Sequence, residues 1–232
     1  MVAKYYLSLE DADKVDFNTA YANTYQTVSY ERTALAEGAY GTIMLPFVPD
    51  ANSLKKYDFF EFDSFDTETN TLNFKQADEV KANVPYLYKL TDSPEGDLNY
   101  ITGSTTTIQS VNGYTKSVEK DGWKSVGCYS KNTVMTNKGD GTYYAISTKD
   151  NQFHRITNSI STRPYRVYYV NTNTSTNAPT ILSLRFRNGS TQIINATQVE
   201  GWEEDVYYDL MGRRVMNPTN GIYIVNGKKV IL

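Results

Sequence analysis

Short runs of alternating apolar and polar residues recur about every ten residues along most of this 232-residue chain. About fourteen such runs are separated by Gly, Pro, Asn and Asp, the residues that tight turns require. Helical periodicity is scarce and is confined to short candidates at residues 11–22 and 51–56. Evenly spaced short strands are typical of sandwiches and barrels, and are not typical of alternating β and α units. The spacing therefore predicts an all-β chain built around a β-sandwich or jelly-roll-like domain.

Turn dipeptides mark places where neighbouring strands are expected to pair. Asp-Gly stands at 140–141, and Asn-Gly stands at 188–189 and 226–227, each between strand patterns. These dipeptides favour type I′ turns, whose twist matches that of the strands they join. We therefore expect a hairpin at each position. Because the last one lies in a small strand-rich segment, we predict a β-sandwich domain over 1–198 and a C-terminal β-hairpin module over 199–232.

Composition favours an exported protein. The chain contains twenty tyrosines and a single cysteine, Cys128, so a disulfide within the chain is impossible. No apolar run approaches the roughly 20 residues of a membrane-spanning helix, and the first residues carry no signal-peptide pattern. A tyrosine-rich composition suits partly exposed sheets better than a helical cytoplasmic enzyme. We expect a secreted or cell-surface protein whose signal peptide is absent from this sequence, with no membrane span.

Charge is unevenly distributed although the net charge is only −3. Residues 151–199 carry five arginines and no acid, whereas residues 200–209 carry five acids. The simplest expectation is that basic strands lie beside acidic ones and neutralise them. A basic face for anionic glycans or phosphates is the alternative. No nucleic-acid-binding motif accompanies the arginines, so nucleic acid is not an expected partner.

Catalytic constellations are mostly absent. His154 is the only histidine, so a zinc site built on histidines is not expected, and Ser-His-Asp or Cys-His catalysis would depend on this residue. Cys128 lies inside a strand pattern, where a small buried residue is usual. We therefore predict a chain that is not an enzyme and has no cofactor or metal. Acidic residues leave two alternatives open, a carboxylate pair for glycoside hydrolysis and a calcium site. The candidates are Glu61, Asp63, Asp66, Glu203, Glu204 and Asp205.

Aromatic residues supply the candidates for ligand binding. Sugar-binding modules stack aromatic faces on pyranose rings, and an aromatic ring also serves as an apolar core residue. Both uses are open for each candidate. The candidates are Trp123, Tyr129, Tyr168 and Trp202.

The C-terminal residues follow a specific pattern: a Tyr-Asp-Leu-x-Gly-Arg strand, a short loop, a Gly-Ile-Tyr-Ile strand and a Gly-Lys-Lys hairpin. This pattern resembles the C-terminal tails of Bacteroidetes surface proteins, including type IX secretion sorting tails. The resemblance implies an exported protein, with export machinery as a partner of the tail. The residues that carry it are Tyr208, Asp209, Leu210, Gly212, Arg213, Gly221, Ile222, Tyr223, Ile224, Gly227, Lys228 and Lys229.

The body of the chain carries a second resemblance. Arg32, GAYGTIMLPF at 38–47, ANVPYL at 82–87 and RPYRVY at 163–168 resemble a β-rich, adhesin-like domain of large secreted Bacteroidales proteins. This implies a non-catalytic adhesion or scaffold module at the cell surface, with an extracellular glycan or protein as its partner. Two alternatives remain, a carbohydrate-binding module of a glycan-utilisation system and an accessory domain of a glycoside hydrolase.

Overall fold

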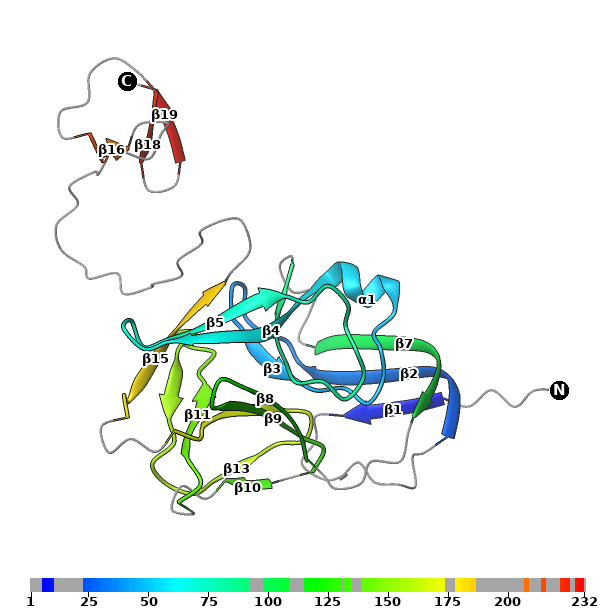
Figure 1. Cartoon of the computed structure of the whole chain (residues 1–232). Coiled ribbons are helices and arrows are strands. Elements are labelled where there is room, and N and C mark those ends of the chain that lie inside the picture. Colours follow the sequence, from blue (N-terminus) through cyan, green and yellow to red (C-terminus); the bar gives the residue numbers. More distant parts are fainter. Residues whose placement is uncertain are drawn as a thin grey trace. The chain divides into compact units, whose positions relative to one another are not determined.

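The chain is composed of strands, with one short helix among the described residues. The computed structural model divides it into two compact units, residues 1–195 and 196–232 (Figure 1). The all-β class predicted from the strand spacing is confirmed. The described residues are 6–10, 23–91, 98–108, 115–130, 132–134, 139–173, 178–186, 207–208, 214–215, 222–225 and 228–231.

The first unit contains fifteen strands and the helix among its described residues. They are β1 (Tyr6–Glu10), β2 (Asn23–Thr33), β3 (Gly41–Ile43), α1 (Ala51–Lys56), β4 (Tyr57–Asp66), β5 (Thr71–Gln76), β6 (Tyr86–Leu90), β7 (Leu98–Ile108), β8 (Thr115–Lys120), β9 (Trp123–Cys128), β10 (Asn132–Val134), β11 (Thr142–Ile146), β12 (Phe153–Arg155), β13 (Ile160–Thr162), β14 (Val167–Asn171) and β15 (Ile181–Phe186).

Ten of these strands form one large sheet in the order β3-β6-β4-β5-β15-β12-β11-β14-β9-β8. β15 runs parallel to β5, and the other neighbours in this sheet are antiparallel. The sheet curls so that its edge strand β3 approaches β14. There the Thr42 hydroxyl donates to the Val167 carbonyl at 3.1 Å and accepts from the Val167 N–H at 3.0 Å. The Met44 N–H donates to the Tyr165 carbonyl at 3.0 Å. The curled sheet therefore encloses much of its own inner face.

Aromatic rings fill the space inside the curl. Phe74 stacks on Phe153 with ring centroids 5.8 Å apart, and Tyr169 meets both rings edge-on. Trp123 packs against Tyr144 at 5.6 Å. Such rings bury large apolar areas, and tilted or edge-on contacts add to the stabilisation. The tyrosine-rich composition thus serves the core as well as the surface.

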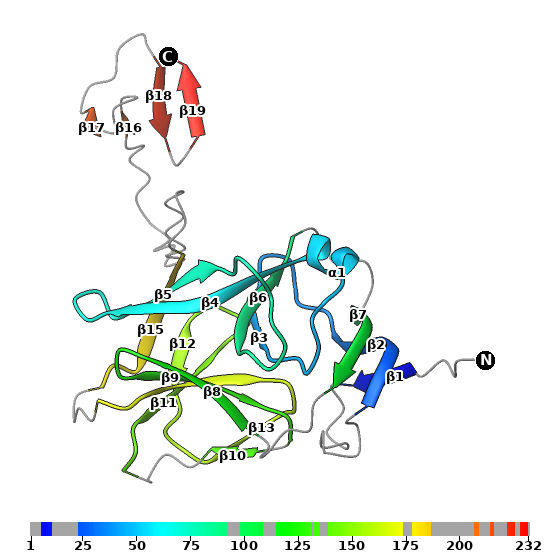
Figure 2. The same ribbon diagram turned by 45° about the vertical axis from the view of Figure 1, so that its right-hand side comes forward.

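A three-stranded sheet, β1-β2-β7, covers another part of this core and gives the unit its sandwich-like second layer (Figure 2). Burial alternates along β2, as expected for a strand with one covered face. The ring centroids of Tyr30 on β2 and Tyr165 lie 4.9 Å apart. The Arg32 guanidinium carbon lies over the Tyr88 ring, 5.2 Å from its centroid. At Gly103 of β7, an added Cβ would approach the Phe47 ring to 2.6 Å, so only glycine fits where the layers meet.

Helix α1 and the residues before it cover the outer edge of β7. The Asp50 N–H donates to the Thr102 carbonyl at 2.7 Å, and the Thr102 N–H donates to Ser53 Oγ at 2.8 Å. Asp50 also caps α1 by accepting from the N–H groups of Asn52 and Ser53, and its Oδ2 accepts from the Thr102 hydroxyl at 2.6 Å. Paired edge groups cannot recruit another chain, so this segment protects the edge.

The elements predicted from local sequence patterns agree with the structure better than the predicted strand pairings do. The helix predicted at 51–56 is confirmed, and β4 and β5 pair as an antiparallel hairpin. The hairpin predicted at 140–141 is wrong, because β10 pairs with β13, while β11 pairs with β12 and β14. The predicted helix at 11–22 and turn at 188–189 lie outside the described residues.

The second unit has four described strands, β16 (Tyr207–Tyr208), β17 (Arg214–Val215), β18 (Ile222–Val225) and β19 (Lys228–Ile231). They form one antiparallel sheet in the order β17-β16-β18-β19. Val225 pairs with Lys228, which confirms the hairpin predicted at 226–227. The predicted boundary at 198–199 lies outside the described residues. No helix among the described residues is long and apolar enough to cross a membrane.

We expect the contribution of Asp50 to stability to depend on pH. Burial would raise the pKa of this carboxyl, but hydrogen bonds from Thr102, Ser53 and Asn52 outweigh burial and hold the pKa below its usual value. The folded state therefore binds this proton more weakly than the unfolded state does. The resulting stabilisation is present above a pH of about 4 and is lost as the pH falls through the folded pKa.

Asp50→Asn tests this expectation because asparagine also caps helices but does not titrate. Asp50→Ala should lower the free energy of unfolding at neutral pH by about 1 kcal/mol, the usual cost of losing an N-cap. Urea unfolding at neutral and acidic pH measures both variants. The difference between wild type and Asp50→Asn should shrink on acidification. Parallel pH profiles for these two proteins would contradict the proposed hydrogen bonding.

Candidate functional site

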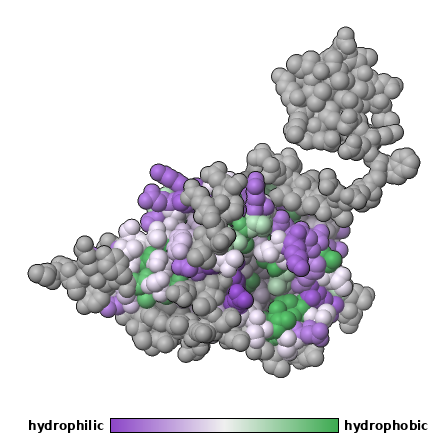
Figure 3. All heavy atoms as spheres, turned by 180° about the vertical axis from the view of Figure 1, so that it is seen from behind, coloured by the Kyte–Doolittle hydropathy of each residue, from purple (hydrophilic) through white to green (hydrophobic). Residues whose placement is uncertain are grey.

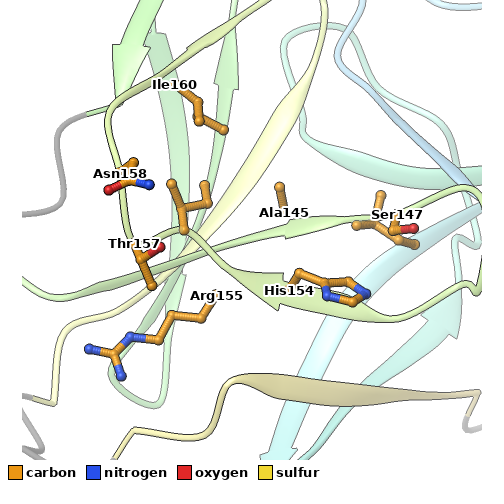
Figure 4. A pocket seen from close by; sticks show the side chains of 9 residues that line it. Ala145, Ser147, His154, Arg155, Thr157, Asn158 and Ile160 are labelled. Atoms are coloured by element: carbon orange, nitrogen blue, oxygen red, sulfur yellow. The ribbon is translucent and has the colours of Figure 1, made fainter.

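A pocket of about 350 Å³ lies where the ends of β11 and β12 meet β13 (Figure 4). Its lining combines aliphatic side chains with short polar ones, the usual composition of a small binding site. Ile160 is 38 % exposed, and Ile181, which pairs with His154 across β15 and β12, is also exposed. The lining residues are Ala145, Ile146, Ser147, His154, Arg155, Ile156, Thr157, Asn158 and Ile160.

The turn between β11 and β12 holds one wall of this pocket. Asn151 lies in this turn with a left-handed backbone (φ 55°), which asparagine tolerates better than most residues. Its side chain accepts from the Tyr40 N–H at 2.9 Å and donates to the Gly38 carbonyl at 3.0 Å. The turn is therefore tied to a segment more than a hundred residues earlier in the chain. This attachment gives the pocket wall a defined position.

His154 is bonded to an acid of the same turn. Its Nε2 lies 2.8 Å from Asp150 Oδ2. Burial acts to raise the pKa of Asp150, but hydrogen bonds from His154, the Gln152 N–H and Ser147 outweigh it and hold the pKa below its usual value. Ser147 and His154 thus both bind Asp150. In a nucleophilic triad the histidine lies between serine and aspartate, so this arrangement stabilises a turn instead of activating Ser147.

Arg155 contributes little charge to the floor of the pocket. Its Nη1 donates to the Ala178 carbonyl at 3.2 Å. Figure 4 shows its side chain directed away from Ala145 and Ile160. The pocket therefore has an aliphatic floor and a rim of small polar groups, which suits an apolar side chain flanked by hydrogen-bonding groups.

Cys128, at the end of β9, belongs to the same apolar cluster as the pocket residue Ile156. It is fully buried, and the Thr162 hydroxyl lies 3.7 Å from its sulfur. Burial among apolar groups disfavours the thiolate, which is the reactive form. The cysteine therefore packs as a small apolar residue. It belongs to a second apolar cluster formed by Val126, Cys128, Val134, Tyr143, Ile156, Tyr168 and Val170.

The structure places three of the four predicted ligand-binding aromatics away from solvent. Trp123 is 1 % exposed and Tyr129 is fully buried, with its hydroxyl donating to Asn83 Oδ1 at 2.7 Å. Tyr168 is nearly buried and packs on Tyr143 with ring centroids 6.0 Å apart. Burial raises the pKa of Tyr168 to about 12. These three residues are therefore corrected to core residues, because their rings fill the two apolar clusters. Trp202 lies outside the described residues.

One exposed aromatic ring was not among the sequence candidates. Tyr100 of β7 is 53 % exposed, the highest value among the large apolar residues described. The Thr-rich sequence that follows Tyr100 is typical of an exposed sheet, but it does not specify which face of the strand meets solvent.

The tail residues singled out from the sequence are only partly described. Tyr208 lies on β16, where its backbone pairs with Arg214 and Ile224. Tyr223 and Lys228 lie on the paired strands β18 and β19. Ile222, Ile224 and Lys229 lie on the same two strands. The other motif residues lie outside the described residues, and they are Asp209, Leu210, Gly212, Arg213, Gly221 and Gly227.

Each described acidic candidate for hydrolysis or calcium binding lies near a base on another strand of the large sheet, and Glu203, Glu204 and Asp205 lie outside the described residues. Glu61 lies 3.6 Å from Lys75, and Asp63 lies 3.2 Å from Lys120. Asp66 lies 3.3 Å from Arg185, which confirms at this pair the expected neutralisation of the basic segment by earlier acids. Among the described residues, no group of three or more His, Cys, Asp or Glu is placed to hold a metal ion.

No model of a protein family matches the chain, and neither a curated protein nor a solved structure does.

We expect the thiol of Cys128 to be protected in the folded chain. A disulfide-exchange reagent should modify it roughly a hundredfold more slowly under native conditions than in denaturant, because reaction requires local opening of the sheet. The absorbance of the released thiol measures both rates, and the unfolded chain is the control. A native rate equal to the unfolded rate would show an accessible thiol and reopen the case for a cysteine nucleophile.

Proposed function

We propose that this chain is a non-catalytic adhesion or scaffold module of a secreted, Bacteroidetes-type cell-surface protein. The observation that carries the proposal is the pocket with an aliphatic floor between β11, β12 and β13. A site of this composition binds an apolar side chain by desolvation and fixes its orientation through a few polar groups. The ligand is therefore an extracellular protein that presents an exposed aliphatic residue.

The disposition of the reactive groups supports binding instead of catalysis. The thiol of Cys128 is buried, and His154 is bonded to Asp150 in an order that does not activate a serine. Glu61 and Asp63 were two of the carboxylates that left glycoside hydrolysis open as an alternative, and each has a lysine partner. Each acid is therefore engaged in an ion pair, whereas glycoside hydrolysis requires two carboxylates that face a sugar across a cleft.

Export to the surface is supported by the C-terminal pattern. The described residues of this segment form a four-stranded sheet, and they belong to a compact unit other than the one that carries the pocket. A small unit that is compact by itself suits recognition by export machinery, because the first unit need not unfold for the second to be bound. The secreted or surface location and the export partner are parts of the same proposal.

If the pocket binds the ligand, a charged side chain placed in it should weaken adhesion. Ile160→Glu places a charge beside the aliphatic floor, and we expect binding to weaken at least roughly tenfold, since desolvating an unpaired carboxylate is costly. Beads carrying the purified chain are tested on surfaces coated with mucin, collagen or fibrinogen. Val118→Glu is the matched control, because Val118 is similarly exposed, at 44 %, on the distant edge strand β8. Equal adhesion by the two variants, or no adhesion by wild type, contradicts the proposal.

If the tail is a sorting signal, its removal should reduce the amount of protein at the cell surface. Deletion after Glu200 removes the four-stranded unit and leaves the residues of the first unit in place. In the native host we expect the truncated protein to be folded but depleted from the cell surface. Surface proteolysis and fractionation measure its location, and circular dichroism of the purified protein measures its folding. Normal surface amounts of the truncated protein would refute a sorting role for the tail.

A further inference from the structure

The outward face of the three-stranded sheet has a composition unlike that of the core. Its inward face carries Val28, Tyr30 and Ile101, all fully buried. Because side chains alternate across a strand, the outward face carries the residues between these positions. The pairing register places Thr27 opposite Ser104, Ser29 opposite Thr102 and Glu31 opposite Tyr100, while Ser8 of β1 lies opposite Ser29. This hydroxyl face, as we call it, thus consists of Ser8, Thr27, Ser29, Glu31, Tyr100, Thr102 and Ser104.

These side chains remain at least partly accessible. Ser8, Tyr100 and Ser104 are exposed, and Thr27 and Ser29 are half-buried. Directly opposed side chains lie about 5 Å apart, and successive ones on the same face of a strand lie roughly 7 Å apart. Tyr100 and the hydroxyls therefore form an open array on the surface of the sheet instead of lining an enclosed pocket. On the face of the molecule drawn in Figure 3, apolar patches lie among polar side chains.

The strand that carries Tyr100 is held from its outer edge. The Tyr57 hydroxyl donates to the Tyr100 carbonyl at 3.3 Å. Two residues along, the Thr102 carbonyl and N–H are bonded to Asp50 and Ser53. The backbone of this strand is already held in place, so little backbone entropy is lost when a ligand binds to the Tyr100 ring. This favours affinity.

Charge narrows the class of ligand. Glu31 lies opposite Tyr100, and none of the described side chains on this face is basic. An anionic ligand would be repelled and would find no cation to pair with. A neutral ligand rich in hydroxyl groups can instead donate to the Glu31 carboxylate and exchange hydrogen bonds with Ser29 and Ser104. Its apolar C–H surface can pack on the Tyr100 ring.

From these observations we infer that the hydroxyl face binds a neutral polysaccharide, with Tyr100 as the stacking platform and Glu31 as the hydrogen-bond acceptor beside it. The open face suits an extended chain that contacts several residues, and does not suit a single enclosed sugar. This site goes beyond the proposed function, because it lies on β2 and β7 and shares no residue with the pocket beside β13.

Affinity electrophoresis tests the inference with the full chain. The probes are soluble neutral polysaccharides (mannan, xyloglucan, laminarin and starch) and two anionic ones (polygalacturonate and hyaluronan). We expect at least one neutral polysaccharide to retard wild type and neither anionic one to do so. Tyr100→Ala should weaken that retardation at least roughly tenfold. Tyr100→Phe, which keeps the ring, should stay within roughly threefold of wild type.

The controls separate this site from the pocket. Ile160→Glu should bind the polysaccharide as wild type does, whereas Glu31→Gln should bind more weakly. The inference is overturned if no neutral polysaccharide retards wild type, if Tyr100→Ala binds like wild type, or if Tyr100→Phe and Tyr100→Ala lose binding equally. Retardation only by the anionic polymers, or binding only to the coated proteins, also overturns it. Circular dichroism confirms that each variant is folded.

Discussion

Closure of the large sheet at Thr42 is the interaction on which the rest of the first unit depends. The Thr42 hydroxyl satisfies both the N–H and the carbonyl of Val167, so the β3 edge meets β14 without a regular ladder between them. Tyr165, two residues before Val167, has a left-handed backbone (φ 62°) that is unusual for an aromatic residue. Its N–H donates to Cys128 and its ring packs on Tyr30. One short segment therefore joins the curl to the second layer.

This closure determines how the aromatic residues are used. A sheet that curls around its own inner face needs large side chains to fill the enclosed space at protein density. Trp123, Tyr129 and Tyr169 fill that space, and they are unavailable to a ligand. The surfaces left for binding are then those whose side chains point outward, namely the pocket beside β13 and the hydroxyl face of β2 and β7. Both depend on strand alternation, and each is held by hydrogen bonds to a distant segment.

The hydrogen bonds that hold the two binding surfaces are of the same kind. Asn151 ties the pocket turn to the segment around Tyr40, and Asp50 with Ser53 ties the edge of β7 to α1. In both places a short polar side chain pairs with backbone groups that have no partner in a ladder. Pairing removes the cost of leaving those groups unsatisfied, and it also limits the motion of the neighbouring surface. Binding surfaces on this chain therefore lie next to fixed backbone.

The amino-acid sequence by itself determined the all-β class, most strand positions, helix α1 at 51–56 and the hairpin at 226–227, because each of these depends on local alternation, caps or turn dipeptides. Asp121-Gly122 carries the same turn signal between β8 and β9, with positive φ at both residues, although it was not used in the prediction. Only the tertiary structure decided that β10 pairs with β13, that Trp123 and Tyr129 lie in the core and that Tyr100 faces solvent. Alternation specifies that a strand has two faces, but which face is buried depends on partners far away in the chain. Those partners are chosen by the packing of the whole curled sheet, which no local pattern encodes.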